Sequence, residues 1–256
     1  MSGFKLLTTK SNAVYEYDGS LGGFYCCVHE SVYKKEMPLS IITQGSGGLL
    51  PPKWIETDRE KALKVCESIE KKISPAALAL CETVFLSNLA DKELHTLRFL
   101  LLGYEVGALV TGMLADPVVA PLIEAKRFIG NEAHLLKGFV RFREYEGKLV
   151  ATITPKNYVL PVLMPHFCER YAEETFMIYD KTHHAALVYE NGRAQIGYLQ
   201  ELNLPEKEEK EKYYQALWRQ FYRTIGIEPR RNERTRRRHM PMRYWENMIE
   251  MENEKE

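Results

Sequence analysis

The sequence predicts an α+β fold with a mostly helical N-terminal part, a mainly antiparallel sheet carrying a helix on one face, and a C-terminal helix with a basic segment. Helical periodicity dominates residues 13–137, whereas the alternation typical of strands dominates residues 138–200. The C-terminal helix and the Arg-rich segment occupy about residues 205–245. We expect one domain over residues 13–245 and a disordered acidic tail at 246–256.

The helical part begins with a short strand at 13–17, a turn at 18–20 and a helix to about residue 35. A Gly/Pro-rich loop is expected at 44–52. Four helices follow, and each begins at a residue type that caps helix N-termini: Thr57, Ser74, Asp91 and Asp116. Thr57 with Glu60 matches a capping box, and a proline follows both Ser74 and Asp116. We expect the fourth helix to end near Lys137.

The sheet part begins where the hydrophobic period changes from helical to alternating. Residues 139–145 and 149–154 predict a hairpin, and a helix over 156–171 is expected to be broken or kinked at Pro161 and Pro165. Three further strands are predicted at 176–179, 185–189 and 194–198. Asn191-Gly192 joins the last two strands and indicates a tight hairpin turn, because both residues tolerate positive φ angles. A helix over 205–225 follows.

Composition excludes several classes of protein. The five cysteines are odd in number and form no Cys-x-x-Cys pair, which argues against a disulfide framework and a structural metal site. The most apolar run, residues 99–114, is interrupted by Glu105 and is shorter than the ~20 residues that a membrane span requires. Residues 1–10 lack the apolar region of a signal peptide. We therefore expect a cytoplasmic protein with reduced thiols.

The zero net charge hides a strongly basic segment near the C-terminus. Seven arginines lie between Glu228 and Arg243 and precede the acidic tail: Arg230, Arg231, Arg234, Arg236, Arg237, Arg238 and Arg243. Guanidinium groups match phosphate oxygens, so this segment indicates nucleic-acid contact. The alternative is a solvated face neutralised by the glutamates of the tail. Nearby aromatic residues Tyr214, Trp218 and Tyr222 fall at helical spacing, which we interpret as a core-facing stripe that includes Ile225. The alternative is that aromatic residues beside the arginines, such as Trp218 and Phe221, stack on unpaired bases.

Two groups of residues are candidates for acid–base chemistry. Glu132 and His134 lie where the last long helix meets the first sheet strand, but two-residue spacing makes them diverge on a helix. His166 and Arg170 share a helix face, and Asp180 could reach that face after the next turn. Each group also has a structural interpretation: a helix-terminal His at the first, and a buried ion pair at the second.

Other chemistry finds little support in the sequence. His183, His184 and His239 suggest a metal site with His166, but no ligand spacing supports it, so no metal and no cofactor are expected. Phosphate-binding loops, dinucleotide-binding glycine motifs, the Gly-x-Ser-x-Gly motif and the zinc-deaminase signature are absent.

Several short motifs are distributed over the chain: Tyr17-Asp18-Gly19-Ser20, Glu132-Ala133-His134, Gly138-Phe139-Val140-Arg141-Phe142, His166-Phe167-Cys168-Glu169-Arg170, Leu217-Trp218-Arg219 and Met240-Pro241-Met242-Arg243-Tyr244-Trp245. Together these motifs resemble a bacterial family of DNA-metabolism or DNA-repair proteins that contains the domain of unknown function 4130. The resemblance covers about residues 14–245. The chain departs from the family by about a dozen extra residues at its start and by Leu135, where relatives have arginine.

The resemblance implies a stand-alone family member found beside a radical SAM protein, and elsewhere fused to a uracil-DNA glycosylase domain. We therefore expect a nucleic-acid-binding accessory protein of DNA repair or modification, whose partners are DNA and a radical SAM protein. Arg141, Arg170 and Arg219 join the seven arginines of the basic segment as expected DNA contacts. Two alternatives stay open: an enzyme acting on a DNA base or nucleotide through Glu132, His134, His166 or Asp180, and a protein-interaction subunit.

Overall fold

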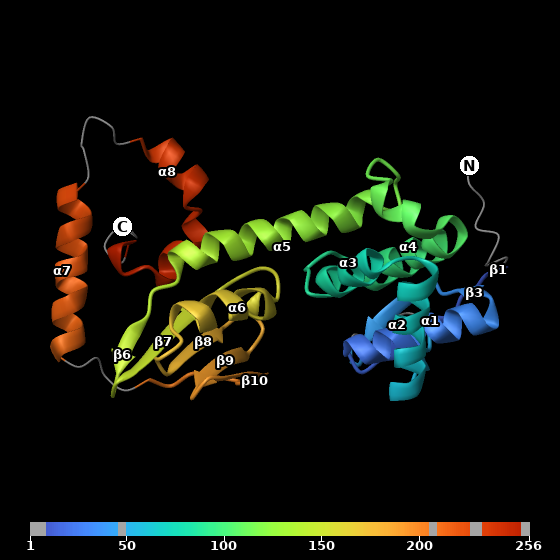
Figure 1. Cartoon of the computed structure of the whole chain (residues 1–256), viewed down its shortest axis with the longest axis horizontal. Coiled ribbons are helices and arrows are strands. Elements are labelled where there is room, and N and C mark those ends of the chain that lie inside the picture. Colours follow the sequence, from blue (N-terminus) through green and yellow to red (C-terminus); the bar gives the residue numbers. More distant parts are fainter. Residues whose placement is uncertain (1–8, 46–49, 205–208, 226–231, 252–256) are drawn as a thin grey trace. The chain divides into compact units, whose positions relative to one another are not determined.

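The computed structural model describes residues 9–45, 50–204, 209–225 and 232–251 (Figure 1). The fold is α+β, as the sequence predicts, and the chain forms two compact units, Met1–Ile129 and Gly130–Glu256. Each unit has its own hydrophobic core. Helix α5 (Ala120–Phe139) crosses the boundary: its buried Ala125 belongs to the first core and Ala133 to the second. The sequence predicts a single domain with a helical part that ends near residue 137.

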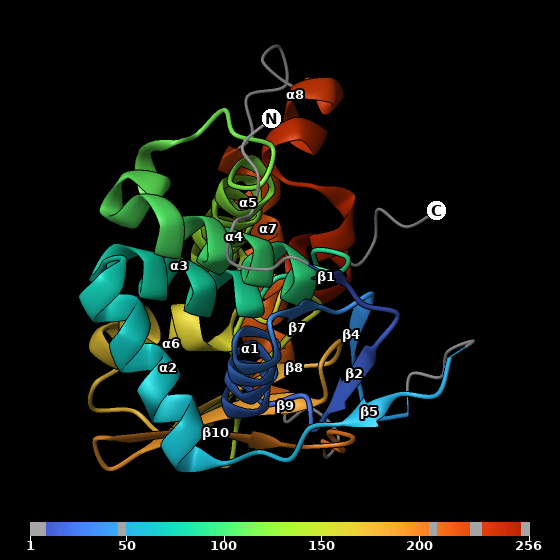
Figure 2. The ribbon, with the colours of Figure 1, turned by 90° about the vertical axis from the view of Figure 1, so that its right-hand side faces the viewer.

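The N-terminal unit combines small parallel sheets with helices (Figure 2). Strand β2 (Val14–Tyr17) lies between β4 (Ser40–Thr43) and β5 (Lys53–Trp54), and β1 (Thr9–Lys10) pairs with β3 (Glu36–Met37). Helix α1 (Leu21–Lys34) packs on β2 and on α2 (Arg59–Lys72). The remaining elements are α3 (Pro75–Phe85), α4 (Lys92–Val106) and the 3-10 helix η1 (Gly107–Gly112).

The helix starts follow the capping residues closely, with two corrections. Ser74 caps α3 as predicted, since its hydroxyl accepts from the Ala77 N–H at 3.1 Å. The predicted Thr57 capping box is wrong: Asp58 caps α2, and the Thr57 hydroxyl instead donates to Asp18 at 2.8 Å. Helix α5 begins at Ala120 rather than at residues 116–117, because the Asp116 carboxylate binds the Val118 N–H and forms a separate turn.

The C-terminal unit contains a five-stranded sheet in the order β10-β9-β8-β7-β6. Its strands are β6 (Arg143–Tyr145), β7 (Lys148–Ile153), β8 (Phe176–Asp180), β9 (Ala185–Glu190) and β10 (Arg193–Tyr198). Every pairing is antiparallel except that of β7 with β8. Helix α6 (Leu160–Arg170) forms the crossover connection between these two parallel strands. The hairpin turn between β9 and β10 has φ of 51° at Asn191 and 74° at Gly192, as its Asn-Gly sequence predicts.

Helix α6 (Leu160–Arg170) runs antiparallel to the two strands that it connects. It begins four residues later than predicted and continues through Pro165, while Pro161 lies in its first turn, where an N–H has no helical partner. Its N-terminus therefore lies at the carboxyl edge of β7 and β8, and its C-terminus lies toward their amino edge. Leu160, Leu163 and Phe167 pack onto the sheet in the second core.

Helical segments follow the sheet in the described residues: α7 (Glu209–Ile225) and α8 (Glu233–His239), both labelled in Figure 1, and the short η3 (Met242–Asn247) and η4 (Ile249–Met251). The sequence predicts a disordered tail from residue 246, but residues 246–251 lie in or between η3 and η4. The rest of the predicted tail lies outside the described residues. Met248 and Met251 are buried in the second core, and Glu250 is buried beside them. Apolar residues between the glutamates explain this order. None of the described helices is long and apolar enough to cross a membrane.

Candidate nucleic-acid interface

A groove of about 960 Å³ lies in the C-terminal unit between the end of α5, the end of α6, and α7 with η4. Its aromatic lining comprises Phe142, Phe167, Tyr171, Tyr214, Trp218 and Phe221. Its cationic lining comprises Lys137, Arg141 and Arg170. Glu211 contributes one carboxylate. The groove therefore combines ring surfaces with positive charge, which is the combination that holds unpaired nucleic acid in many proteins.

Helix α7 forms one wall of the groove with its aromatic stripe. Trp218 is 40% exposed, Phe221 is 54% exposed, and Tyr214 and Ile225 are also exposed. The interpretation of this stripe as core is therefore wrong, although Tyr222 does pack against the second core. The face that α7 buries is polar: Glu211 accepts the Glu144 N–H at 3.2 Å and the Gln215 side-chain amide at 2.6 Å.

An ion pair between Arg141 and Glu250 fixes α7 and η4 at the groove. Arg141 Nη2 donates to Glu250 at 2.6 Å and its Nη1 donates to the Gly138 carbonyl at 2.8 Å. The Trp218 Nε1 donates to the same carboxylate at 3.1 Å, and the guanidinium lies over the Trp218 ring. Burial raises the pKa of Glu250, but these hydrogen bonds outweigh it and hold the pKa below its ordinary value. Arg141 follows the end of α5 and precedes β6, so the first strand begins at Arg143 and not at residue 139 as the sequence predicts.

Lys137, His166 and Arg170 form a basic cluster at the α6 side of the groove. Lys137 and Arg170 are exposed, and His166 is half-buried. Burial lowers the pKa of His166, and the charges of Lys137 and Arg170 lower it further, against the opposite effect of Glu169. Both cations therefore lie close enough to the imidazole to act on it. The sequence indicates His166 and Arg170 as site residues but not Lys137, because the periodicity of α5 does not show which polar residue faces a neighbouring element.

The arginines of the basic segment divide into exposed and internal side chains. Arg234, Arg237 and Arg238 are exposed on α8, at spacings of three and four that share one helix face. Arg236 points the other way, pairs with Glu233 at 3.3 Å and lies over the Trp245 ring at 4.8 Å. Arg219 is half-buried on α7. The predicted contacts Arg230 and Arg231 lie outside the described residues.

Glu132 is a buried carboxylate that accepts five hydrogen bonds. Its Oε1 binds the Lys156 N–H at 3.0 Å, the Tyr244 hydroxyl at 3.1 Å and Arg243 Nη2 at 3.1 Å. Its Oε2 binds the Asn157 N–H at 2.8 Å and the Asn157 side-chain amide at 2.7 Å. Burial raises the pKa of Tyr244 to about 12, with the Glu132 charge adding to it and Arg243 opposing it. This carboxylate joins α5, the loop after β7 and η3, whereas His134 is exposed, so the two candidates diverge.

Asp180 does not join His166 in the structure. It ends β8 at the carboxyl edge of the sheet, opposite the edge toward which the end of α6 points. Its buried carboxylate accepts the Thr182 N–H at 3.0 Å and lies 2.7 Å from His183 Nδ1. The His183 ring also contacts Tyr158 edge-on. Asp180 thus orients a half-exposed imidazole, an arrangement that can serve proton transfer or simply close the turn between β8 and β9.

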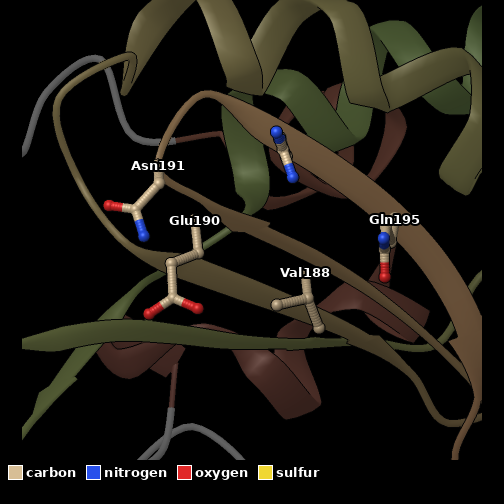
Figure 3. A pocket seen from close by; sticks show the side chains of 5 residues that line it. Val188, Glu190, Asn191 and Gln195 are labelled. Carbon is tan, nitrogen blue, oxygen red and sulfur yellow. The ribbon is translucent and has the colours of Figure 1, made fainter.

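A second hollow, of about 410 Å³, lies at the hairpin of β9 and β10 (Figure 3). Val188, Glu190, Asn191 and Gln195 surround it, together with Arg193. Cross-strand register places Val188 opposite Gln195, and Glu190 opposite Arg193. These pairs give the hollow no nucleophile and no convergent charge. Within the described ranges, no three His, Cys, Asp or Glu side chains are placed to hold a metal ion.

The C-terminal unit is thus an α+β unit with a basic, aromatic-lined groove. The family model for a domain of unknown function, DUF4130, matches residues 90–250, and the chain belongs to this family. No curated protein and no solved structure matches the chain.

Proposed function

We propose that this protein binds nucleic acid through its C-terminal unit and acts as an accessory protein of DNA repair or modification. The observation that carries the proposal is the groove that sets exposed Trp218 and Phe221 opposite the cations of α5 and α6. Aromatic rings can stack on bases, and nearby cations neutralise the backbone. The groove therefore offers both interactions that a nucleic-acid strand requires.

The exposed face of α8 supplies a second source of positive charge. Arg234, Arg237 and Arg238 present their guanidinium groups to solvent, and none of the ion pairs between described residues engages them. Phosphate neutralisation releases counterions, so such side chains make affinity depend steeply on salt. By contrast, Arg236, Arg141 and Arg243 are held by Glu233, Glu250 and Glu132.

Fluorescence anisotropy with a labelled oligonucleotide, repeated over a range of salt concentrations, tests the proposal. The triple change Arg234→Ala, Arg237→Ala and Arg238→Ala should weaken binding and reduce the slope of log affinity against log salt. Each phosphate contact that is lost should reduce that slope by about 0.9 on duplex or about 0.7 on single strands.

A matched control removes three exposed cations from α2 of the other unit: Lys64, Lys71 and Lys72. This control changes the net charge equally and should leave affinity and slope close to those of the parent protein. Equal losses of affinity in both triple variants would mean that overall charge, and not the position of the α8 arginines, determines binding. Unchanged affinity in the α8 variant would remove that helix from the interface.

We also propose, from the family resemblance, that the protein works with a radical SAM protein. Co-expression and co-purification of the two chains test this part. If the two chains form a complex in nuclease-treated extract and the protein binds no oligonucleotide, the result would favour a protein-interaction subunit instead.

The Asp180–His183 pair favours a second candidate function, an enzyme acting on a DNA base or nucleotide. Because Asp180 binds the Nδ1 side of the ring, the other ring nitrogen is the one left for proton transfer. The change His183→Gln should then abolish release of a base from, or cleavage of, an oligonucleotide while binding persists. If the parent protein neither releases a base nor cleaves the oligonucleotide, only the binding function would remain.

A further inference from the structure

We propose that the groove selects unpaired nucleotides: Lys137 and Arg170 hold a phosphate of a single strand, and an adjoining base stacks on Phe221 and Trp218. This inference rests on the proposed function and specifies the type of strand that the site accepts. Duplex DNA would reach only the cations at the rim.

The phosphate position follows from the distribution of charge along the groove. Lys137 on α5 and Arg170 on α6 are both exposed, and no ion pair within the described part of the chain engages either one. His166 lies within their influence, as the direction of its pKa shift indicates. The carboxylate of Glu211 lines the groove from α7, and its oxygens already accept from Glu144 and Gln215. The α6 side is therefore the side that attracts an anion.

The base position follows from the ring surfaces of α7. The Trp218 and Phe221 rings lie 5.8 Å apart with an interplanar angle of 35°. The hydrogen bond from Trp218 to Glu250 and the Arg141 guanidinium over its ring hold Trp218 in place before any ligand arrives. Ordering a side chain in advance lowers the entropic cost of binding. Phe221 is more exposed and leaves its ring available for stacking.

Stacking on the rings of the groove favours a single strand over a paired helix. In a duplex the base faces are stacked on one another and are hidden from protein rings, so stacking requires unpaired or extruded bases. A volume of about 960 Å³ lies at the upper end of the range of about 300–1,000 Å³ for pockets that enclose small ligands. The groove is therefore matched to single nucleotides along a strand rather than to a whole duplex.

Competition binding with three probes of equal length tests the inference: an oligothymidylate, its duplex with oligoadenylate, and a strand of abasic sites with the same number of phosphates. The single strand should bind at least about tenfold more tightly than either other probe. Phe221→Ala should weaken single-strand binding by about 5- to 150-fold, equivalent to the ~1–3 kcal/mol of one stacked base, and should leave abasic binding unchanged.

The matched control is Tyr213→Ala, which removes a 62% exposed ring from the same helix outside the groove lining. It should bind like the parent protein. The double change Lys137→Gln with Arg170→Gln should weaken the binding of the single strand and of the abasic strand together, because both probes carry the phosphates.

Two outcomes separate the failures. Equal affinity for the three probes, with no effect of Phe221→Ala but a steep salt dependence, would overturn the single-strand inference and leave nucleic-acid binding intact. Failure of every probe to bind would overturn both. Equal losses in the Phe221 and Tyr213 variants would also contradict the inference, since the effect would then reflect α7 in general.

Discussion

Glu132 is predicted to stabilise the C-terminal unit rather than to perform catalysis, and Glu132→Gln measures this directly. The NH2 group that replaces one carboxylate oxygen donates hydrogen bonds and cannot accept them. If the amide nitrogen takes the place of Oε2, the Asn157 N–H and the Asn157 side-chain amide lose their acceptor. If it takes the place of Oε1, the donors from Lys156, Tyr244 and Arg243 lose theirs. At least two donors are therefore left without an acceptor in either orientation.

Each buried donor without an acceptor costs about 1–3 kcal/mol, and partial relaxation makes such costs less than additive. We expect Glu132→Gln to reduce the unfolding free energy of the C-terminal unit by about 2–4 kcal/mol. Urea unfolding monitored by tryptophan fluorescence suits this measurement, because Trp218 and Trp245 both lie in this unit.

The control is Glu124→Gln on the same helix, where the carboxylate is exposed and lies 3.5 Å from Arg127. It should change stability by less than about 0.5 kcal/mol. A loss below about 1 kcal/mol for Glu132→Gln would refute the reasoning. A loss of activity in that variant, without a stability measurement, would not identify a catalytic carboxylate.

Three further predictions concern single contacts. Gly23→Ala should destabilise the N-terminal unit by about 1–3 kcal/mol, because a Cβ there would lie 2.3 Å from an Asp18 oxygen. Gly22→Ala meets nothing closer than 3.6 Å and should be neutral or slightly stabilising. Urea unfolding followed through Trp54, which lies on β5 in the N-terminal unit, compares the two variants. The unfolding free energy, measured as a function of pH, should show the depressed pKa of Glu250. The ionised Glu250 carboxylate should contribute its full stabilisation above pH 4.5, the ordinary pKa of a glutamate. That stabilisation should be lost as the pH falls through the lower pKa of the folded state. Glu250→Gln should remove that part of the acid dependence. Arg236→Ala should cost about 1 kcal/mol by thermal unfolding, whereas Arg237→Ala should stay within about 0.5 kcal/mol.

Local signals in the sequence predicted most of the elements. Ser74-Pro75 marks the start of α3, and Asn191-Gly192 marks the β9–β10 turn, because each depends on the φ angles and hydrogen bonds of neighbouring residues only. The prediction of the residue that caps α2 is wrong by one position. The Thr57 hydroxyl donates a hydrogen bond to Asp18, which is distant in the sequence, and so does not cap the helix.

The groove could be predicted only in part, because it depends on long-range pairs. The bond between Arg141 and Glu250 joins residues 109 positions apart, and no local pattern indicates it. Without that pair, the aromatic stripe of α7 is indistinguishable from an ordinary core-facing stripe. The number of arginines likewise does not show which of them are exposed. Arg236 lies over Trp245 whereas its neighbours on α8 face solvent, and this difference depends on how α8 packs.

Hydroxyl-radical footprinting of the aromatic residues, with and without a single-stranded oligonucleotide, tests the central claim most directly. The account predicts that oxidation of Trp218 and Phe221 falls on binding, while oxidation of Tyr33 on α1, which is 78% exposed, stays unchanged. Unaltered oxidation of Trp218 and Phe221 at saturating oligonucleotide would contradict the account, because the strand would then bind elsewhere on the protein.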